Sequence, residues 1–375
     1  MLPEDSYREK ILVPSSNFNT NLRTLKLGYH PQFTRNMLHI NNGDGTFSEI
    51  GQMAGISRTD WSWSSLFMDL DNDGYKDLFV SNGFRRELGN LDYINYNEFS
   101  PFTNPGADIQ GQIDGINNTP GIPLANYVYK NNGDLTFTNT VKEWGFELPT
   151  YSNGVVMSDL DLDGDLDIVI NNIDMQASVY ENLSDENLEH HYLDILLTGY
   201  GQNIGSIGTR IVLHNDQSKQ VIEINPYRGY LSSVENQAHF GLGDNDKVDS
   251  IKVYWPDGKS SLHKTTAVDT VLTLSYPEAS SAVEPLITDK NVPKQFFSDI
   301  TSASNISFKH RENKQIDFHK QFLLPHQHSK LGPGIAVGDV NGDGIDDCYV
   351  GGAHGQSGQL FIPVSYTHPE PTRPY

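Results

Sequence analysis

The sequence is poor in cysteine and has no long hydrophobic run. Cys348 is the one cysteine among 375 residues, so no disulfide can form within the chain. Secreted animal proteins of this size commonly carry more cysteines, and a bacterial envelope or extracellular origin fits this count better. No stretch reaches the roughly 18 apolar residues of a membrane-spanning helix. The first residues, MLPEDSYREK, lack the basic and apolar regions of a signal peptide, which is expected if the chain is a fragment.

Basic residues are also scarce. The 26 lysines and arginines face 48 aspartates and glutamates, which gives a formal net charge of −22. Non-specific binding to nucleic acid or to an anionic membrane needs basic patches, so this composition argues against both. We find no Ser/His/Asp or Cys/His arrangement with local support, and no phosphate-binding loop. Hydrophobic residues make up 37% of the chain, enough to build cores. The composition indicates a folded acidic protein in which cations form part of the structure.

What the sequence does contain is an acidic loop that occurs three times. The pattern D-x-[DN]-x-D-G-x-x-D begins at Asp69, Asp159 and Asp339. Carboxylates crowded into one turn repel one another, and a divalent cation removes this repulsion. Alternating oxygen ligands around a glycine bend are typical of calcium loops, where position 7 contributes a backbone carbonyl. The predicted ligands for up to three structural Ca²⁺ ions are Asp69, Asp71, Asp73, Tyr75 and Asp77, then Asp159, Asp161, Asp163, Asp165 and Asp167, then Asp339, Asn341, Asp343, Ile345 and Asp347.

Two other interpretations of these loops are weaker. An EF-hand loop needs a glutamate at position 12 and flanking helices, but position 12 is Val80, Ile170 or Val350 and short β-type runs follow. A solvated acidic turn would use the same residue types. Three copies with the same spacing and the same glycine favour calcium loops that each join two β-strands.

The loops lie within a longer repeat. NNGDGTF at residues 41–47 recurs as NNGDLTF at 131–137, and the first two acidic loops, at Asp69 and Asp159, have the same 90-residue offset. Each unit is predicted to contain a strand, an N-N-G-D hairpin, a strand, a connection, a strand, the acidic loop and a strand. Four short antiparallel strands at a fixed period are typical of β-propeller blades, although about 40–50 residues per blade is more usual. The additional length is an insert at 84–125, expected either to protrude from a rim and bind a partner or to be a plain surface loop.

A domain without acidic loops follows the first two units. Alternating apolar runs between residues 189 and 276 predict a compact antiparallel β-sandwich or small barrel. Arg210, Arg228, His239 and Trp255 are candidates for a recognition face, although each has an alternative as a turn or core residue, and the core is favoured for Trp255.

The rest of the chain is predicted to hold a linker and one more blade. Residues 277–294 have linker composition, 295–364 resemble the first blade of a second, truncated propeller, and 365–375 are expected to be an extraneous tail. The N-terminus is expected to begin among blade-like strands. His319, His326 and His328 are candidate transition-metal ligands, with polar packing in a loop as the favoured alternative.

The acidic loops with their hairpins resemble FG-GAP/VCBS repeats, the calcium-binding blades of integrin-like propellers. IGTRI (207–211), RGYLSS (228–233), HFGLG (239–243) and VYWPDGK (253–259) resemble the ASPIC/UnbV domain. Together they resemble the cartilage acidic protein-like family in its bacterial multi-propeller form. The chain is therefore predicted to be all-β: blades at 1–188, a sandwich-like domain at 189–276 and the start of a second propeller.

The leading functional interpretation is a calcium-stabilised, non-enzymatic protein that binds a polymer or a protein partner. Its expected location is extracellular, on the cell surface, or in the periplasm or outer membrane of a bacterium. The alternative is a propeller-based hydrolase or lyase acting on polysaccharide, with Glu87, Asp92, Glu98, Asp108 and Asp114 of the insert as unassigned acids. A third interpretation is adhesion through an open, solvent-facing cation, but the loops' full ligand sets favour closed structural sites.

Overall fold

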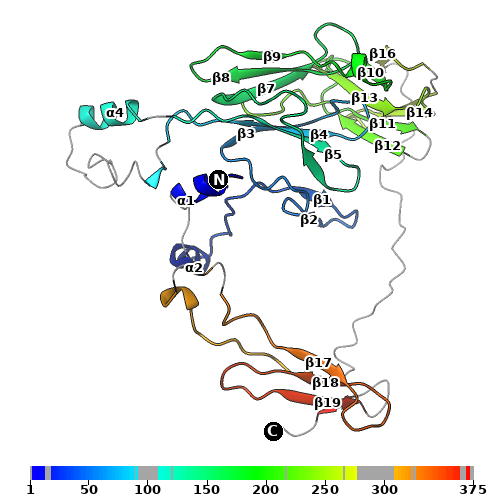
Figure 1. Ribbon diagram of the computed structural model, residues 1–375. Helices are drawn as coiled ribbons and strands as arrows, with labels where there is room; N and C mark the ends of the chain where they lie inside the picture. The colour runs from blue at the N-terminus through cyan, green and yellow to red at the C-terminus, as the bar shows by residue number, and fades with distance from the viewer. Residues whose placement is uncertain are drawn as a thin grey trace. The chain divides into compact units, whose positions relative to one another are not determined.

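The computed structural model describes residues 2–12, 18–87, 89–91, 109–119, 121–215, 218–264, 267–276, 308–321, 324, 327–363 and 369–371. The chain divides into two compact units, Met1–Glu284 and Pro285–Tyr375, which we describe separately. Most elements are strands in small sheets, and helices are short (Figure 1). The mostly-β prediction is confirmed, although the described residues do not form a closed propeller. No described helix has both the length and the apolar character that crossing a bilayer requires.

The strands of the first two repeat units follow the predicted order. The first unit contains β1 (His39–Asn41), β2 (Phe47–Glu49), β3 (Ser62–Met68) and β4 (Asp77–Asn82). The second contains β5 (Tyr127–Asn131), β6 (Phe137–Asn139), β7 (Ser152–Ser158) and β8 (Asp167–Asn172), and β9 (Ser178–Tyr180) follows. The N-N-G-D hairpins are built alike: the side chain of Asn41 accepts a hydrogen bond from Gly43 N at 2.8 Å, and Asn131 accepts one from Gly133 N at 3.0 Å.

The sheets do not coincide with the repeat units of the sequence. One sheet has the order β3-β4-β5-β6 and therefore takes two strands from each unit, because Leu78–Val80 of β4 pair antiparallel with Tyr127–Tyr129 of β5. The next sheet is β7-β8-β9, and β1-β2 pair only with each other. The insert at 84–125 thus lies within one sheet, between its second and third strands. A repeat period fixes the spacing of equivalent residues but not the strand at which a blade begins. The repeat units predicted from the sequence are therefore shifted by two strands relative to the sheets.

Two segments outside the sheets are helical where the sequence predicted strands or irregular chain. The N-terminal segment forms α1 (Ser6–Ile11) and α2 (Phe18–Lys26), not blade-like strands. Asp5 accepts a hydrogen bond from Arg8 N and thereby caps α1. The Arg8 guanidinium reaches Asp60 at 2.5 Å and Glu87 at 3.2 Å. Within the insert, α4 (Ile109–Asn117) is helical.

A shared core joins the two blade sheets. The sequence SWSSLFM of β3 alternates buried and exposed side chains in its second half, as expected for a strand with one buried face. Leu66 and Met68 of β3 and Phe79 of β4 pack in one cluster with Val155 of β7 and Ile168 of β8. The acidic loops leave the ends of these packed strands, so the core fixes their relative positions.

The domain after the blades is a two-layer β-sandwich. Its strands are β10 (His191–Thr198), β11 (Arg210–Asn215), β12 (Ser218–Glu223), β13 (Gln237–Gly243), β14 (Ser250–Tyr254), β15 (Ser260–His263) and β16 (Val271–Ser275). They form sheets of order β13-β10-β16 and β12-β11-β14-β15, which enclose a core that includes Phe240 and Trp255. The core prediction for Trp255 is confirmed. The purely antiparallel prediction is wrong, because β10 and β16 pair in parallel.

The second unit contains one four-stranded sheet, in the order β17 (Ile335–Gly338), β18 (Asp347–Val350), β19 (Gln359–Pro363) and β20 (Pro369–Pro371). The third acidic loop joins β17 to β18. Strand β20 falls within the tail predicted at 365–375, so part of that tail does continue the strand pattern. A single turn of 3-10 helix, η2 (Asp317–His319), precedes the sheet. The linker predicted at 277–294 lies outside the described residues.

Candidate metal centres

The three acidic loops share one backbone arrangement. We call them loop 1 (Asp69–Asp77), loop 2 (Asp159–Asp167) and loop 3 (Asp339–Asp347). In each, the aspartate at position 1 accepts a hydrogen bond from the glycine N–H at position 6, at 3.0, 3.1 and 2.8 Å respectively. The aspartate at position 5 accepts one from the N–H at position 7, at 2.8, 3.1 and 2.8 Å. The aspartate at position 9 accepts one from the N–H at position 2, at 3.1, 2.9 and 2.9 Å. Backbone amides therefore orient the carboxylates in the same way three times.

Two residues in each loop have positive φ, which makes the turn tight. Position 6 is glycine with φ of 89°, 98° and 84° in loops 1, 2 and 3. Position 4 is Asn72, Leu162 and Gly342, with φ of 55°, 68° and 79°. Glycine and asparagine adopt this region readily, whereas leucine is strained there. The glycine of the sequence pattern is thus required by the backbone.

Loop 1 brings buried carboxylates to within ligand distance. Asp69, Asp71 and Asp77 each offer an oxygen, and these oxygens lie within 4.8 Å of one another. The three side chains are 1%, 7% and 0% exposed, and Oδ1 of both Asp69 and Asp71 has no hydrogen-bond partner. Burial raises the pKa of Asp69 to about 6 and that of Asp77 to about 8. Buried carboxylates this close together, two of which have an unpartnered oxygen, fit a hard divalent cation, whose oxygen ligands lie at about 2.3–2.6 Å for Ca²⁺.

Not every predicted ligand of loop 1 joins this group. Asp73 lies beside it, and its side chain accepts hydrogen bonds from Tyr75 N and, at 3.1 Å, from the ammonium group of Lys130 on β5. Lys130 also pairs with Asp71. Burial alone would lower the pKa of Lys130, but its two carboxylate partners outweigh this effect and raise it. Lys130, which the sequence analysis missed, thus offsets part of the negative charge of loop 1.

Loop 2 contains more carboxylates than the pattern requires. Asp159, Asp161 and Asp163, three of its predicted ligands, each offer an oxygen, and these oxygens lie within 4.8 Å of one another. Asp167 is not part of this group; its two oxygens accept hydrogen bonds from Leu160 N and Asn182 N. Burial raises the pKa of Asp163 to about 7. Asp165 was predicted to contribute its backbone carbonyl. Its side chain is buried and accepts hydrogen bonds from Ser184 N and Asp185 N.

Loop 3 retains the backbone arrangement without a ligand group of three carboxylates among the described residues. Asp339 and Asp343 are exposed, and Asn341 donates to Asp343 at 2.8 Å. Backbone hydrogen bonds, above all from Gly344 N, lower the pKa of Asp339. Oδ1 of Asp347 is nevertheless buried without a partner. Loop 3 is therefore the most exposed of the three.

Asn72, at position 4 of loop 1, connects three parts of the first unit. Its side-chain amide donates to Gly164 O of loop 2 at 3.1 Å. Its side-chain oxygen lies 2.7 Å from Nε2 of His239 on β13, and its backbone oxygen accepts from Gly243 N at 2.7 Å. His239 is buried and also hydrogen-bonded to Asp194 at 2.9 Å. The HFGLG segment of the sandwich therefore packs directly against the blade loops.

A second sandwich segment, RGYLSS, also contacts the blades. Tyr230 N donates to Ser64 Oγ on β3 at 2.6 Å, and the Tyr230 ring lies 4.6 Å from the ring of Trp63. Gly229 has φ of 78°, and an added Cβ would lie 2.9 Å from Ser64 Oγ. This glycine is required both by its φ and by the close approach of β3. The segment is a junction between sandwich and blade.

The four residues proposed as a recognition face do not form one. His239 is buried at the blade junction, and Trp255 is buried in the core. Arg210 pairs with Glu223 across two strands at 2.8 Å, and Arg228 donates to the backbone oxygens of Glu223 and Asn225. The alternative roles predicted for these residues, in turns and in the core, therefore fit the structure better than a recognition face.

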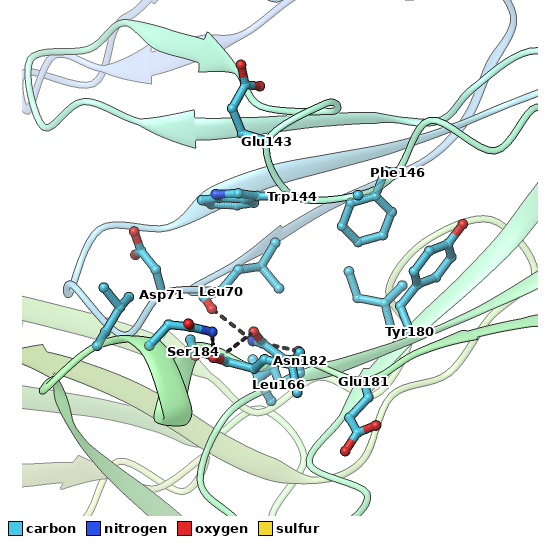
Figure 2. Close-up of a pocket in the computed structure, with 15 residues that line it drawn as sticks. Leu70, Asp71, Glu143, Trp144, Phe146, Leu166, Tyr180, Glu181, Asn182 and Ser184 are labelled. Carbon is cyan, nitrogen blue, oxygen red and sulfur yellow. Dashed lines mark hydrogen bonds between the residues drawn. The ribbon is translucent and has the colours of Figure 1, made fainter.

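A large cavity in the first unit lies beside loop 1. It has a volume of about 560 Å³, and its walls include Trp144, Phe146 and Tyr180 together with Leu70 and Asp71. Figure 2 shows Trp144 and Phe146 on one side and Asn182 with Ser184 on the other, where Asn182 donates to the backbone oxygens of Leu70 and Leu166. The carboxylates of Glu143 and Glu181 point away from each other at opposite edges of this view. The cavity combines aromatic faces with a polar rim.

Other predicted candidates have structural partners or lie outside the described residues. Glu87 of the insert pairs with Arg8, and Asp114 accepts from Gln110 at 3.0 Å on α4. Asp92, Glu98 and Asp108 are outside the described residues, as is His326. Among the described residues, the side-chain groups that could hold a metal ion contain only aspartates. Neither His319 nor His328 belongs to such a group.

Comparison with known proteins agrees with these elements. Residues 199–281 match the family "ASPIC and UnbV", and residues 29–80, which include loop 1, match the "FG-GAP-like repeat" family. The chain contains an FG-GAP-like repeat and an ASPIC and UnbV domain. It is also distantly similar to cartilage acidic protein 1: 24% identical to the human protein over 287 residues, covering 66% of this chain and 42% of the relative. The Xenopus tropicalis protein is 31% identical over 137 residues, covering 35% of this chain and 20% of the relative.

These alignments cover about two fifths or less of the relatives' length. The predicted resemblance is confirmed for the repeat and the sandwich domain, and FG-GAP-like repeats imply propeller blades. RGYLSS and HFGLG, two of the elements that carried the resemblance, lie where the ASPIC and UnbV domain meets the blades.

Replacing Asn72 by glycine should destabilise the first unit. Glycine accepts the φ of 55°, but Gly164 O and His239 Nε2 lose their partner. Leaving buried polar groups unpaired costs about 1–3 kcal/mol, and we expect a loss of this size in the free energy of unfolding, measured by urea denaturation. The matched control is Leu162→Gly at the equivalent position of loop 2, where the side chain is exposed and φ is 68°. Equal losses in both variants would show that the Asn72 contacts contribute nothing.

The metal-free protein should become less stable as the pH rises. Asp69 and Asp77 have pKa values of about 6 and about 8 in the folded chain, against about 4 when unfolded. The folded state therefore binds more protons than the unfolded state between pH 4 and 8, so the free energy of unfolding falls across that window. A bound cation replaces those protons and should remove or reverse the fall. Melting temperatures from pH 5 to 8, in EDTA and in calcium, would test this; parallel curves would contradict it.

Proposed function

We propose that this chain is a calcium-stabilised, propeller-type binding protein without catalytic activity. The observation that carries this proposal is the set of unpartnered buried carboxylate oxygens in loop 1, held by a backbone arrangement that recurs in loops 2 and 3. In this proposal Ca²⁺ is structural: the aspartates would hold it, and it would neutralise carboxylates that the fold places out of water.

The location of loop 1 gives the cation a further structural consequence. Loop 1 contacts loop 2 through Asn72, the sandwich through His239 and Gly243, and the inter-domain connection through His190, whose Nδ1 lies 2.6 Å from Asp71 O. A cation that fixes loop 1 therefore fixes the surfaces on which both neighbours pack. We propose that calcium organises the blade–sandwich junction, which then presents the binding surface.

The cavity beside loop 1 favours a carbohydrate polymer among the two predicted ligand classes. Aromatic faces such as Trp144 and Tyr180 stack on sugar rings, and the amide and hydroxyl groups of Asn182 and Ser184 are suited to hydrogen bonds with sugar hydroxyls. The net charge of −22 disfavours an anionic polymer, so we propose a neutral one. The edge carboxylates Glu143 and Glu181 point apart, whereas a glycosidase pair faces one bond from about 5–10 Å. A binding role therefore accounts for this cavity better than the hydrolase or lyase alternative.

The proposed compartment follows from the cation. Millimolar calcium is available outside cells, and the loops would be filled there. We therefore propose an extracellular, cell-surface or envelope location, which secretion of the full-length protein by its source cells would test.

Calcium should raise the melting temperature of the chain by several degrees relative to EDTA, and magnesium should do so less. Binding to the folded state alone adds about 2.7 kcal/mol at a hundredfold excess over the dissociation constant. Asp161→Asn should reduce the response, because Asp161 is an exposed member of the loop 2 group and its loss does not disturb the core. Glu147→Gln, an exposed acid outside the loops, is the matched control. An unchanged melting curve for the wild type in calcium would refute the proposal.

Trp144→Ala should weaken polysaccharide binding without altering the calcium response. Stacking on an aromatic ring is lost, and we expect at least a tenfold weaker retention in affinity electrophoresis through gels containing neutral polysaccharides. Tyr227→Ala removes an exposed aromatic that does not line the cavity and serves as control. Equal retention of both variants and the wild type on every polymer that binds would exclude the cavity as the site.

A further inference from the structure

Loop 2 adjoins a second group of carboxylates that the repeat pattern does not contain. Asp163, Asp165 and Asp185 each offer an oxygen, and the three oxygens lie within 4.8 Å of one another. Asp185 belongs to α5 (Ser184–Asn187), outside the loop. Two oxygens bound to one Ca²⁺ at 2.3–2.6 Å lie at most about 5 Å apart, so this separation suits a single ion.

The Asp165 carboxylate has one oxygen with hydrogen-bond partners and one without. Its side chain is 1% exposed, and its Oδ2 accepts hydrogen bonds from Ser184 N at 3.0 Å, Ser184 Oγ at 2.9 Å and Asp185 N at 3.1 Å. Its Oδ1 is buried and has no partner. An unpaired buried carboxylate oxygen is costly, and a cation is the partner that its charge and surroundings favour.

Charge compensation points the same way. Loop 2 and α5 together place six aspartates in one region: Asp159, Asp161, Asp163, Asp165, Asp167 and Asp185. Among the described residues, no lysine or arginine forms an ion pair with any of these six aspartates. In loop 1, by contrast, Lys130 forms ion pairs with Asp71 and Asp73. One divalent ion in the loop would leave roughly four negative charges uncompensated.

Two members of the second group, Asp163 and Asp185, also line a polar cavity. A space of about 470 Å³ is lined by Asp163, Ser184, Asp185, Glu189 and Tyr192, among others. Calcium takes six to eight oxygen ligands. Three carboxylates supply only some of them, and a cavity of this size has room for water molecules that would supply the rest.

We propose that loop 2 holds two divalent cations, with Asp163 bridging them. The first lies among Asp159, Asp161 and Asp163, and the second among Asp163, Asp165 and Asp185. The second ion ties loop 2 to α5, the segment that leads into β10 of the sandwich. It goes beyond the structural calcium proposed above because it uses the Asp165 side chain and a residue outside the loop.

Counting bound calcium tests this directly. The whole chain is stripped with EDTA, dialysed to equilibrium against Ca²⁺, and the bound metal per chain is measured by atomic emission. Asp185→Asn should lose one ion per chain, and Asp161→Asn, which affects only the first group, should also lose one. Glu186→Gln removes the neighbouring carboxylate of α5 and should lose none; like Asp185, Glu186 is exposed, and circular dichroism checks that each variant folds.

The outcomes separate this inference from the proposed function. If Asp185→Asn binds as many ions as the wild type, or if Glu186→Gln loses one as well, the second cation is refuted while loop calcium stands. If Asp161→Asn loses an ion and Asp185→Asn does not, only the loop ion exists. If the wild type binds none, both the second cation and the proposed function fail.

Discussion

The fold of the first unit depends on placing carboxylates out of water at the ends of packed strands. Backbone amides of loops 1 and 2 orient these groups, but an amide dipole cannot neutralise a full charge. Burial consequently raises the pKa of Asp69, Asp77 and Asp163 toward neutrality. A protein with 48 acidic and 26 basic side chains has few internal counter-charges to supply. This shortage of internal counter-charge is what supports the proposal that cations bind where the strands turn.

These turns are also where the domains meet, which extends the effect of each loop beyond its own hairpin. The aspartate at position 9 links the loop to the next segment, because Asp77 accepts from Asn131 N and Asp167 accepts from Asn182 N. Asn182 then donates to Leu70 O of loop 1. A short series of hydrogen bonds thus connects loop 1, loop 2 and the start of the sandwich. We expect a change in the conformation of one loop to alter the packing of the others.

The sequence predicted the features that local chemistry determines. Carboxylate spacing, the glycine at position 6 and the paired hairpins each follow from a few neighbouring residues, and the structure has all of them. The sequence did not show at which strand each blade begins, because β4 and β5 pair with each other across the long insert between them. His239 and Arg228 were candidates for a recognition face, with turn or core roles as the alternative. The partner of His239 could not be found from the sequence, because tertiary packing brings Asn72 to it, whereas Arg228 bonds to Glu223 O five residues away in its own turn. Asp185 was missed because it lies outside the loop pattern, although an acidic residue eighteen positions after the loop's last aspartate was visible.

Comparison of the three loops separates what the motif specifies from what its surroundings specify. All three have the same hydrogen bonds and the same left-handed positions, so the nine-residue pattern determines the backbone. Their electrostatic surroundings differ: Lys130 pairs with loop 1, α5 adds a carboxylate beside loop 2, and loop 3 is exposed. A cation entering loop 1 must compete with an ammonium group, whereas one entering loop 2 meets only negative charge. If the loops bind calcium as proposed, the same motif would give sites of unequal strength in one chain, because residues outside the motif set the charge around each loop.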